Sequence, residues 1–150
     1  MYAAQSEIPN LRASSAGTRA VTGHPIEHNA ALVLESLGAD PTKFSARQLT
    51  SAIAFDADLV LTMTTAHRDA VLQLAPQQLA RTFTVHEAAR LTTHCDAQNI
   101  RDLARLRPHL GANGPLDIPD PLGRGQDFFA MVGAQISALL PPILEVCRNR

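Results

Sequence analysis

The apolar positions of the chain show helix-like and strand-like spacing in turn. Ala30, Val33, Leu34 and Leu37 keep the i, i+3, i+4, i+7 spacing of a helix with one buried face, which Gly38 ends. The pattern predicts three strands, at Leu11–Ser14, Leu59–Met63 and Arg81–Val85. Besides the helix that Gly38 ends, which follows the first strand, it predicts a short helix from a cap at Thr50 to Ala54, a helix from Thr64 or Thr65 to Leu74, and a helix at His86–Thr92. The run Leu59–Met63 is apolar without alternation, as in a parallel strand covered on both faces. Strands that alternate with helices predict an α/β fold with right-handed crossovers.

The last third of the chain is predicted to be mostly helical. Residues 96–107 are polar with helical character, and their arginines, Arg101, Arg105 and Arg107, are interpreted as a solvated basic face. A long final helix is expected from about Asp127, with a kink or a stop at Pro141-Pro142, because proline lacks the N–H that the helix needs.

Composition indicates a soluble domain. With 150 residues, 45% of them hydrophobic, the chain suits one compact domain. A net charge of −1 gives no reason to expect nucleic acid or an anionic membrane as a partner. No apolar run reaches the roughly 20 residues of a membrane span, and the N-terminus lacks a secretory pattern, so we expect a cytoplasmic protein. Two cysteines, Cys95 and Cys147, are too few for a disulfide framework.

One loop near the C-terminus carries a candidate catalytic acid. It reads Asp117-Ile118-Pro119-Asp120-Pro121-Leu122-Gly123. The ring of Pro121 excludes the α conformation at Asp120, which holds this carboxyl in an extended pose. An ordinary surface turn would use the same residue types. The motif therefore indicates a catalytic acid only in combination with the other motifs of the chain.

Those motifs are Ser15-Ala16-Gly17-Thr18, Ser45-Ala46-Arg47-Gln48-Leu49, the run from Phe55 to Met63 leading to His67, and Asp127-Phe128 after the Asp-Pro segment. In this order and spacing the chain resembles the low-molecular-weight protein tyrosine phosphatases and their arsenate reductase relatives. The resemblance extends from about Leu11 to the last helix. It implies a three-layer α/β fold, in which a parallel sheet of four strands has helices on both faces.

The resemblance also implies an opening strand, a phosphate-binding loop of the form Cys-x5-Arg-Ser/Thr and a helix, none of which precedes Ser15. Met1–Ser6 matches the end of that helix, so residues 1–150 are interpreted as a single phosphotyrosine phosphatase I-like domain that is incomplete at its N-terminus. In the family a loop thiolate attacks the phosphoester and an acid protonates the departing oxygen. Asp120 matches that acid, and Asp117 is interpreted as a loop-capping residue.

Cys95 is not a convincing substitute for the missing nucleophile, although Cys95–Arg101 satisfies Cys-x5-Arg by count. A phosphate loop needs small residues, so that its backbone N–H groups can curl around a dianion, and a cysteine of lowered pKa. The segment has no glycine, Asp96 would repel phosphate, and Asp102 stands where Ser or Thr is expected.

The histidines do not indicate a metal centre, and no cofactor is expected. Pro25 follows His24, so His24 and His28 are not expected to share a regular helical turn that could bind zinc, and no third ligand is evident. His67 and His86 follow predicted strands and are interpreted as surface or packing residues.

Three interpretations follow. The first is a phosphatase whose opening segment is missing from this sequence, in which case the DNA upstream of Met1 encodes a strand and Cys-x5-Arg-Ser. The second is a noncatalytic binding or regulatory module, with a partner that covers the exposed strand. The third is an arsenate reductase relative, which ranks last because Leu110–Phe129 contains no resolving cysteine. Without the loop we expect residues 1–150 to be inactive, and to be marginally stable, partly unfolded or paired with something else. The expected substrate is a phosphotyrosine protein or a small phosphoester. The sequence does not decide between phosphotyrosine, phosphoarginine and arsenate.

Overall fold

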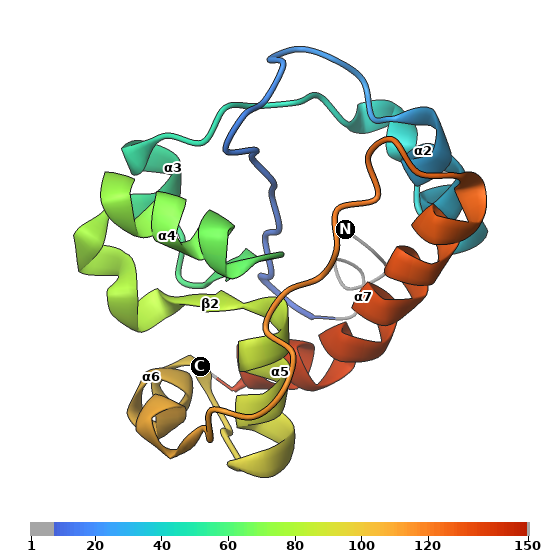
Figure 1. The fold of residues 1–150 in the computed structure, drawn as a ribbon. Coiled ribbons are helices and arrows are strands. Elements are labelled where there is room, and N and C mark those ends of the chain that lie inside the picture. Colours follow the sequence, from blue (N-terminus) through green and yellow to red (C-terminus); the bar gives the residue numbers. More distant parts are fainter. Residues whose placement is uncertain (1–7, 150) are drawn as a thin grey trace. The chain divides into compact units, whose positions relative to one another are not determined.

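The computed structural model describes residues 8–149 (Figure 1). These residues divide into two compact units. Unit 1 comprises residues 8–49 and Asp120–Gln135, and unit 2 comprises Thr50–Pro119 and residues 136–149. Asp120 therefore belongs to unit 1, whereas Asp117 belongs to unit 2. The segment Met1–Ser6, expected to be the end of a helix, lies outside the described residues.

Unit 2 contains a β-α-β arrangement. Its elements are α3 (Ser51–Phe55), β1 (Val60–Thr62), α4 (Thr65–Leu74), the 3₁₀ helix η2 (Pro76–Arg81), β2 (Thr82–Thr84), α5 (Val85–His94), α6 (Ile100–Leu106) and the 3₁₀ helix η3 (Arg107–His109). The two strands are parallel, with Val60 opposite Thr82 and Thr62 opposite Thr84. α4 and α5 both contact this sheet. The parallel pair that the sequence predicts is thus confirmed, and among residues 8–149 it is the one sheet.

Threonine caps fix where the helices of unit 2 begin. The Thr50 hydroxyl accepts a hydrogen bond from the Ile53 N–H at 3.2 Å, and the Thr64 hydroxyl accepts from the His67 N–H at 3.1 Å. These are the caps that the sequence predicts, and each satisfies a backbone donor that the first helical turn leaves free.

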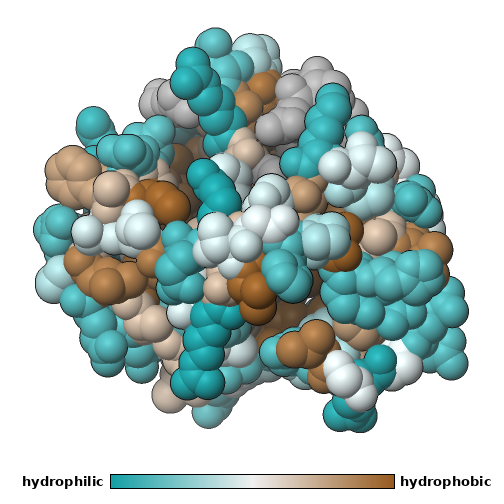
Figure 2. Space-filling view, turned by 90° about the horizontal axis from the view of Figure 1, so that it is seen from above, coloured by the Kyte–Doolittle hydropathy of each residue, from teal (hydrophilic) through white to brown (hydrophobic). Residues whose placement is uncertain are grey.

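The core of unit 2 combines β2, α5 and α6 with the segment before Asp120 and the end of α7 (Gln126–Arg148). Its large, fully buried apolar side chains are Phe83, Val85, Leu91, Leu103, Ile118 and Ile143. Other large apolar side chains of this unit are exposed, among them Phe55, Leu74 and Leu79. On the face shown in Figure 2, brown apolar side chains lie between teal polar ones. Scattered exposure of this kind is normal for a protein surface.

Unit 1 contains α2 (His28–Ser36), the 3₁₀ helix η1 (Pro41–Lys43) and a single parallel bridge between Gly17 and Gln48. The bridge rests on the Gly17 N–H, which donates to the Arg47 carbonyl at 2.9 Å, and the Leu49 N–H, which donates to the Gly17 carbonyl at 2.9 Å. The strand predicted at Leu11–Ser14 was wrong: these residues are irregular, and Arg12, Ala13 and Ser14 are exposed. A strand needs a partner along its edge, and the pairing here begins only at Gly17.

α7 continues through Pro141 and Pro142. Of the two predicted outcomes at these prolines, the stop was wrong, and the kink stays a prediction. The φ angle that the proline ring imposes is helical, which allows the helix to proceed although two N–H donors are lost. By length and apolar composition alone α7 is long enough to cross a membrane, contrary to the sequence-based expectation. A single helix of this kind is weak evidence, because the core helices of soluble proteins pass the same test.

Gly133 marks a close approach of α7 to α2 within unit 1. A Cβ added at this position would lie 2.4 Å from Val33 Cγ1. Valine is restricted at χ1, so the clash is not relieved by a small rotation. We expect overpacking in Gly133→Ala to destabilise the chain by about 1–3 kcal/mol. The higher helix propensity of alanine offsets roughly 1 kcal/mol of this loss.

Urea denaturation measures this effect. Gly125→Ala is the matched control, because a Cβ there meets nothing within 4 Å. Val33→Ala in the Gly133→Ala background should recover stability, and equal midpoints for Gly133→Ala and the unmodified chain would contradict the close packing.

Candidate active-site loop

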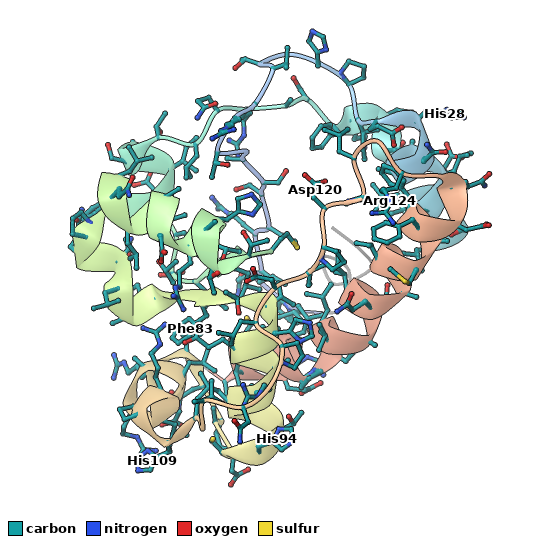
Figure 3. All side chains as sticks on the ribbon, in the orientation of Figure 1. His28, Phe83, His94, His109, Asp120 and Arg124 are labelled. Atoms are coloured by element: carbon teal, nitrogen blue, oxygen red, sulfur yellow. The ribbon has the colours of Figure 1, made fainter. Side chains whose placement is uncertain are left out.

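Asp120 lies on a tight turn in unit 1, at the start of the loop that leads into α7 (Figure 3). Its carboxylate accepts a hydrogen bond from the Leu122 N–H at 2.9 Å. The Arg124 N–H donates to the Pro121 carbonyl at 2.9 Å, which closes a turn with Gly123 at a φ of 77°. Only glycine adopts this angle without strain. Asp120 itself is exposed, so the carboxyl can reach a substrate from solvent.

The residues after the Asp-Pro pair form no open aromatic clamp. The Arg124 guanidinium lies over the Phe128 ring at 4.2 Å from its centre, which occupies one face of the ring. Leu122, at the tip of the turn, is 72% exposed. The side chains that follow Asp120 and Pro121 on this turn therefore include an exposed aliphatic one, Leu122, and a cation, Arg124.

Asp117 has a different role from Asp120. Its Oδ1 accepts from the Thr65 N–H at 2.7 Å, and its Oδ2 lies 3.5 Å from the Thr65 hydroxyl, which donates to it. Thr65 is the first residue of α4. The carboxylate of Asp117 therefore caps the start of a helix, in agreement with the capping role expected from the sequence.

His86 is buried at the start of α5 in unit 2. Burial lowers the pKa of His86 and so does the positive charge of Arg90, while the negative charge of Asp117 opposes them. The packing role expected for His86 agrees with this burial. His24 lies outside α2, which begins at His28, so these two histidines share no helical turn.

The charge of Asp117 gives a testable effect on this histidine. Asp117→Asn removes the one influence that raises the pKa of His86, so we expect the pKa to fall further below the usual 6.5. Proton NMR titration of the imidazole signals measures the pKa of His86. The signal that is missing from the spectrum of His86→Gln identifies this residue. An unchanged or increased pKa would contradict the described proximity of Asp117 to His86.

The Cys95–Arg101 segment lacks the form of a phosphate loop. Cys95 ends α5, and the Ala97 N–H donates to the Leu91 carbonyl at 3.1 Å. The Gln98 N–H donates to the Asp102 carboxylate at 3.1 Å, and the Asn99 side chain caps α6. These amides and side chains are used in ending one helix and beginning the next. The geometry supports the rejection of Cys95 as the nucleophile.

The sequence-based interpretation of Arg107 as part of a solvated basic face was wrong. Its guanidinium lies over the Phe83 ring at 3.9 Å from its centre, and its Nε lies 3.1 Å from Glu87 Oε1. Burial lowers the pKa of Arg107, and the negative charge of Glu87 opposes that effect. The sequence reasoning also missed Glu87. The spacing Thr84-x-x-Glu87, which is that of a capping box, could have indicated it.

Possible metal ligands do not converge in the part of the chain that the structure describes. Within residues 8–149, no group of three or more His, Cys, Asp or Glu side chains is placed to hold a metal ion.

Comparison with known proteins gives the family of the chain. The family profile described as low molecular weight phosphotyrosine protein phosphatase matches residues 1–99, about two thirds of the sequence. The chain belongs to this family. Asp120 lies beyond the matched residues, so its catalytic role stays a prediction.

Individual relatives agree with this assignment. A Klebsiella pneumoniae protein named as a low molecular weight protein-tyrosine-phosphatase is 28% identical over 91% of this chain and 79% of its own length. Two further curated relatives, one from Ralstonia nicotianae and one from Erwinia amylovora, match over just 57% and 55% of their own lengths.

Solved structures confirm the fold class predicted from the sequence, an α/β fold with a parallel sheet. Vibrio vulnificus Wzb, solved with benzylphosphonate, is 26% identical with a TM-score of 0.65, over 91% of this chain and 80% of Wzb. The YwlE arginine phosphatase of Geobacillus stearothermophilus is 22% identical with a TM-score of 0.73, over 97% of this chain and 79% of that one.

Proposed function

We propose that this chain supplies the general acid of a low molecular weight phosphatase site and that the complete site hydrolyses phosphomonoesters through a phosphocysteine. The observation that carries the proposal is the exposed Asp120 carboxyl on its fixed turn, in a chain that belongs to this family. A Cys-x5-Arg loop provides the nucleophile and the cradle of backbone N–H groups for the phosphate. We infer that neither Cys95 nor Cys147 is that nucleophile.

In the first chemical step the loop thiolate forms an S–P bond while the bond from phosphorus to the ester oxygen breaks. Asp120, in its protonated form, donates its proton to the departing oxygen. For tyrosine this oxygen has a pKa of about 10, so leaving without a proton is unfavourable. In the second step the Asp120 carboxylate takes a proton from water, which attacks phosphorus and releases inorganic phosphate and the thiolate.

The substrate class that we propose is phosphotyrosine in proteins, with small aryl phosphates as surrogates. The similar proteins include one named as a tyrosine phosphatase from Klebsiella pneumoniae and an arginine phosphatase from Geobacillus stearothermophilus. Family membership indicates a soluble protein, and we propose the cytoplasm as its location. We further propose that the chain acts without a cofactor and binds neither nucleic acid nor membranes.

A joined enzyme tests this proposal. It consists of a strand, a Cys-x5-Arg-Ser/Thr loop and the start of a helix, in the form that the family resemblance implies, fused ahead of Met1 of residues 1–150. We expect it to hydrolyse p-nitrophenyl phosphate and a phosphotyrosine peptide, with a burst of p-nitrophenol that reports the phosphoenzyme. Replacing the loop cysteine by serine should abolish both the burst and turnover. A folded joined enzyme without turnover would instead favour a noncatalytic binding module.

A further inference from the structure

Two hydrogen bonds attach Asp117 and Ile118, the start of the Asp-Pro segment (residues 117–121), to the corner between β1 and α4. The Thr65 N–H donates to the Asp117 carboxylate at 2.7 Å, and the Ile118 N–H donates to the Met63 carbonyl at 2.8 Å. The Ile118 side chain is 2% exposed. Both contacts lie within unit 2, and 52 residues separate Thr65 from Asp117 in the sequence. The start of the segment is therefore held by hydrogen bonds and by apolar burial.

The negative charge of Asp117 is favourable at the start of α4. The first N–H groups of a helix have no partner within the helix, and that end carries a partial positive charge. Thr64 accepts from the His67 N–H, and Asp117 accepts from the Thr65 N–H, so the two side chains satisfy different donors of the same turn. A carboxylate acceptor makes a shorter and stronger hydrogen bond than a neutral one. Asp117 is thus the charged part of this attachment.

The chain between the attachment and Asp120 is stiff. Ile118 and Asp120 each precede a proline, which biases both away from the α conformation. The ring of Pro119 fixes the φ angle of the one residue between them. Few soft torsions therefore separate the anchored Ile118 from the acid, and a change in the anchor passes along the backbone to Asp120.

We propose that Asp117 is a positioning residue for Asp120. By accepting from the Thr65 N–H it fixes the start of the Asp-Pro segment, and the two prolines carry that constraint to the acid. The inference rests on the proposed function of Asp120 as the proton donor. It assigns Asp117 no contact with the substrate and no proton transfer.

The first test uses residues 1–150 and needs no activity. Hydrogen exchange of the Thr65 and Ile118 amides is followed by NMR in the unmodified chain, in Asp117→Ala and in Asp117→Asn. We expect about tenfold faster exchange in Asp117→Ala, and intermediate rates in Asp117→Asn, which keeps an acceptor without the charge. Asp69→Asn, an exposed acid on α4, is the control and should leave both rates unchanged. Unchanged protection in Asp117→Ala would overturn the anchor.

The second test uses the joined enzyme and compares leaving groups. We expect Asp117→Ala to lower kcat/KM about tenfold for phenyl phosphate, whose leaving phenol needs a proton, and little for 2,4-dinitrophenyl phosphate, which needs none. Asp117→Asn should recover most of the loss. If the alanine variant does not fold, Asp117→Glu, which displaces the carboxylate by one methylene, takes its place in the same comparison.

The outcomes separate the two claims. An Asp120→Asn enzyme that loses activity beside a fully active Asp117→Ala enzyme would overturn the positioning role and leave the proposed function standing. Equal losses for both leaving groups in Asp117→Ala would show general damage and would also overturn it. If Asp120→Asn retains full activity, the proposed function fails and the positioning role fails with it.

Discussion

In the joined enzyme, Asp120→Asn is expected to lower kcat/KM for phenyl phosphate by about 10²–10⁴-fold, the usual contribution of a positioned acid. Asparagine keeps the size of the side chain and an acceptor for the Leu122 N–H, which donates to Asp120 at 2.9 Å, so the turn should persist. The loss would therefore come from the missing proton. With 2,4-dinitrophenyl phosphate the loss should be far smaller, since that leaving group departs as an anion.

The matched control for Asp120 is Asp127→Asn. Asp127 is an exposed acid seven residues later, in the first turn of α7, and its replacement should leave kcat/KM unchanged for both substrates. A uniform loss of activity in Asp120→Asn, independent of the leaving group, would contradict the role of Asp120 as proton donor.

Glu87→Ala is expected to destabilise unit 2 by about 3 kcal/mol or more, of a total of roughly 5–15 kcal/mol. Glu87 is 5% exposed, with Oε1 3.1 Å from Arg107 Nε and Oε2 3.7 Å from Arg68 Nη1. Its removal leaves the partly buried guanidinium of Arg107 without this counter-charge, whereas Arg68 keeps Asp69, whose Oδ1 lies 3.5 Å from Arg68 Nε. It also breaks the capping box, in which the Glu87 N–H donates to the Thr84 hydroxyl and the Thr84 N–H donates to the Glu87 carboxylate.

Urea denaturation of residues 1–150 measures this loss, and Glu87→Gln separates its causes. Glutamine keeps an acceptor for the Thr84 N–H but not the charge, so its loss isolates the ion pairs. Glu145→Gln is the control, because the Glu145–Arg148 pair at 3.1 Å is exposed and should contribute about 0–1 kcal/mol. A Glu87→Ala midpoint as high as that of Glu145→Gln would contradict the role assigned to this cluster.

Local signals in the sequence predicted most of the elements. Thr50 and Thr64 act as caps because their hydroxyls reach amides three residues ahead, an interaction that depends on neighbours in the chain alone. The apolar run Leu59–Met63 likewise contains β1. Its expected cover on both faces is incomplete, because Val60 and Leu61 are only partly buried.

Contacts between distant residues could not be predicted in this way. The strand expected at Leu11–Ser14 depended on a partner that its own residues do not specify. Arg107 was predicted to be solvated because the spacing of charged residues in the sequence does not reveal that its guanidinium packs on the ring of Phe83. The attachment of Asp117 to Thr65 spans 52 residues, and only the folded chain shows it.

The central claim is that Asp120 serves a thiolate other than the cysteines of residues 1–150. The most direct measurement is hydrolysis of p-nitrophenyl phosphate by purified residues 1–150 alone, beside the Cys95→Ser variant. We predict no turnover above the buffer blank for either protein. Turnover by the unmodified chain that Cys95→Ser abolishes would identify Cys95 as the nucleophile and contradict this account.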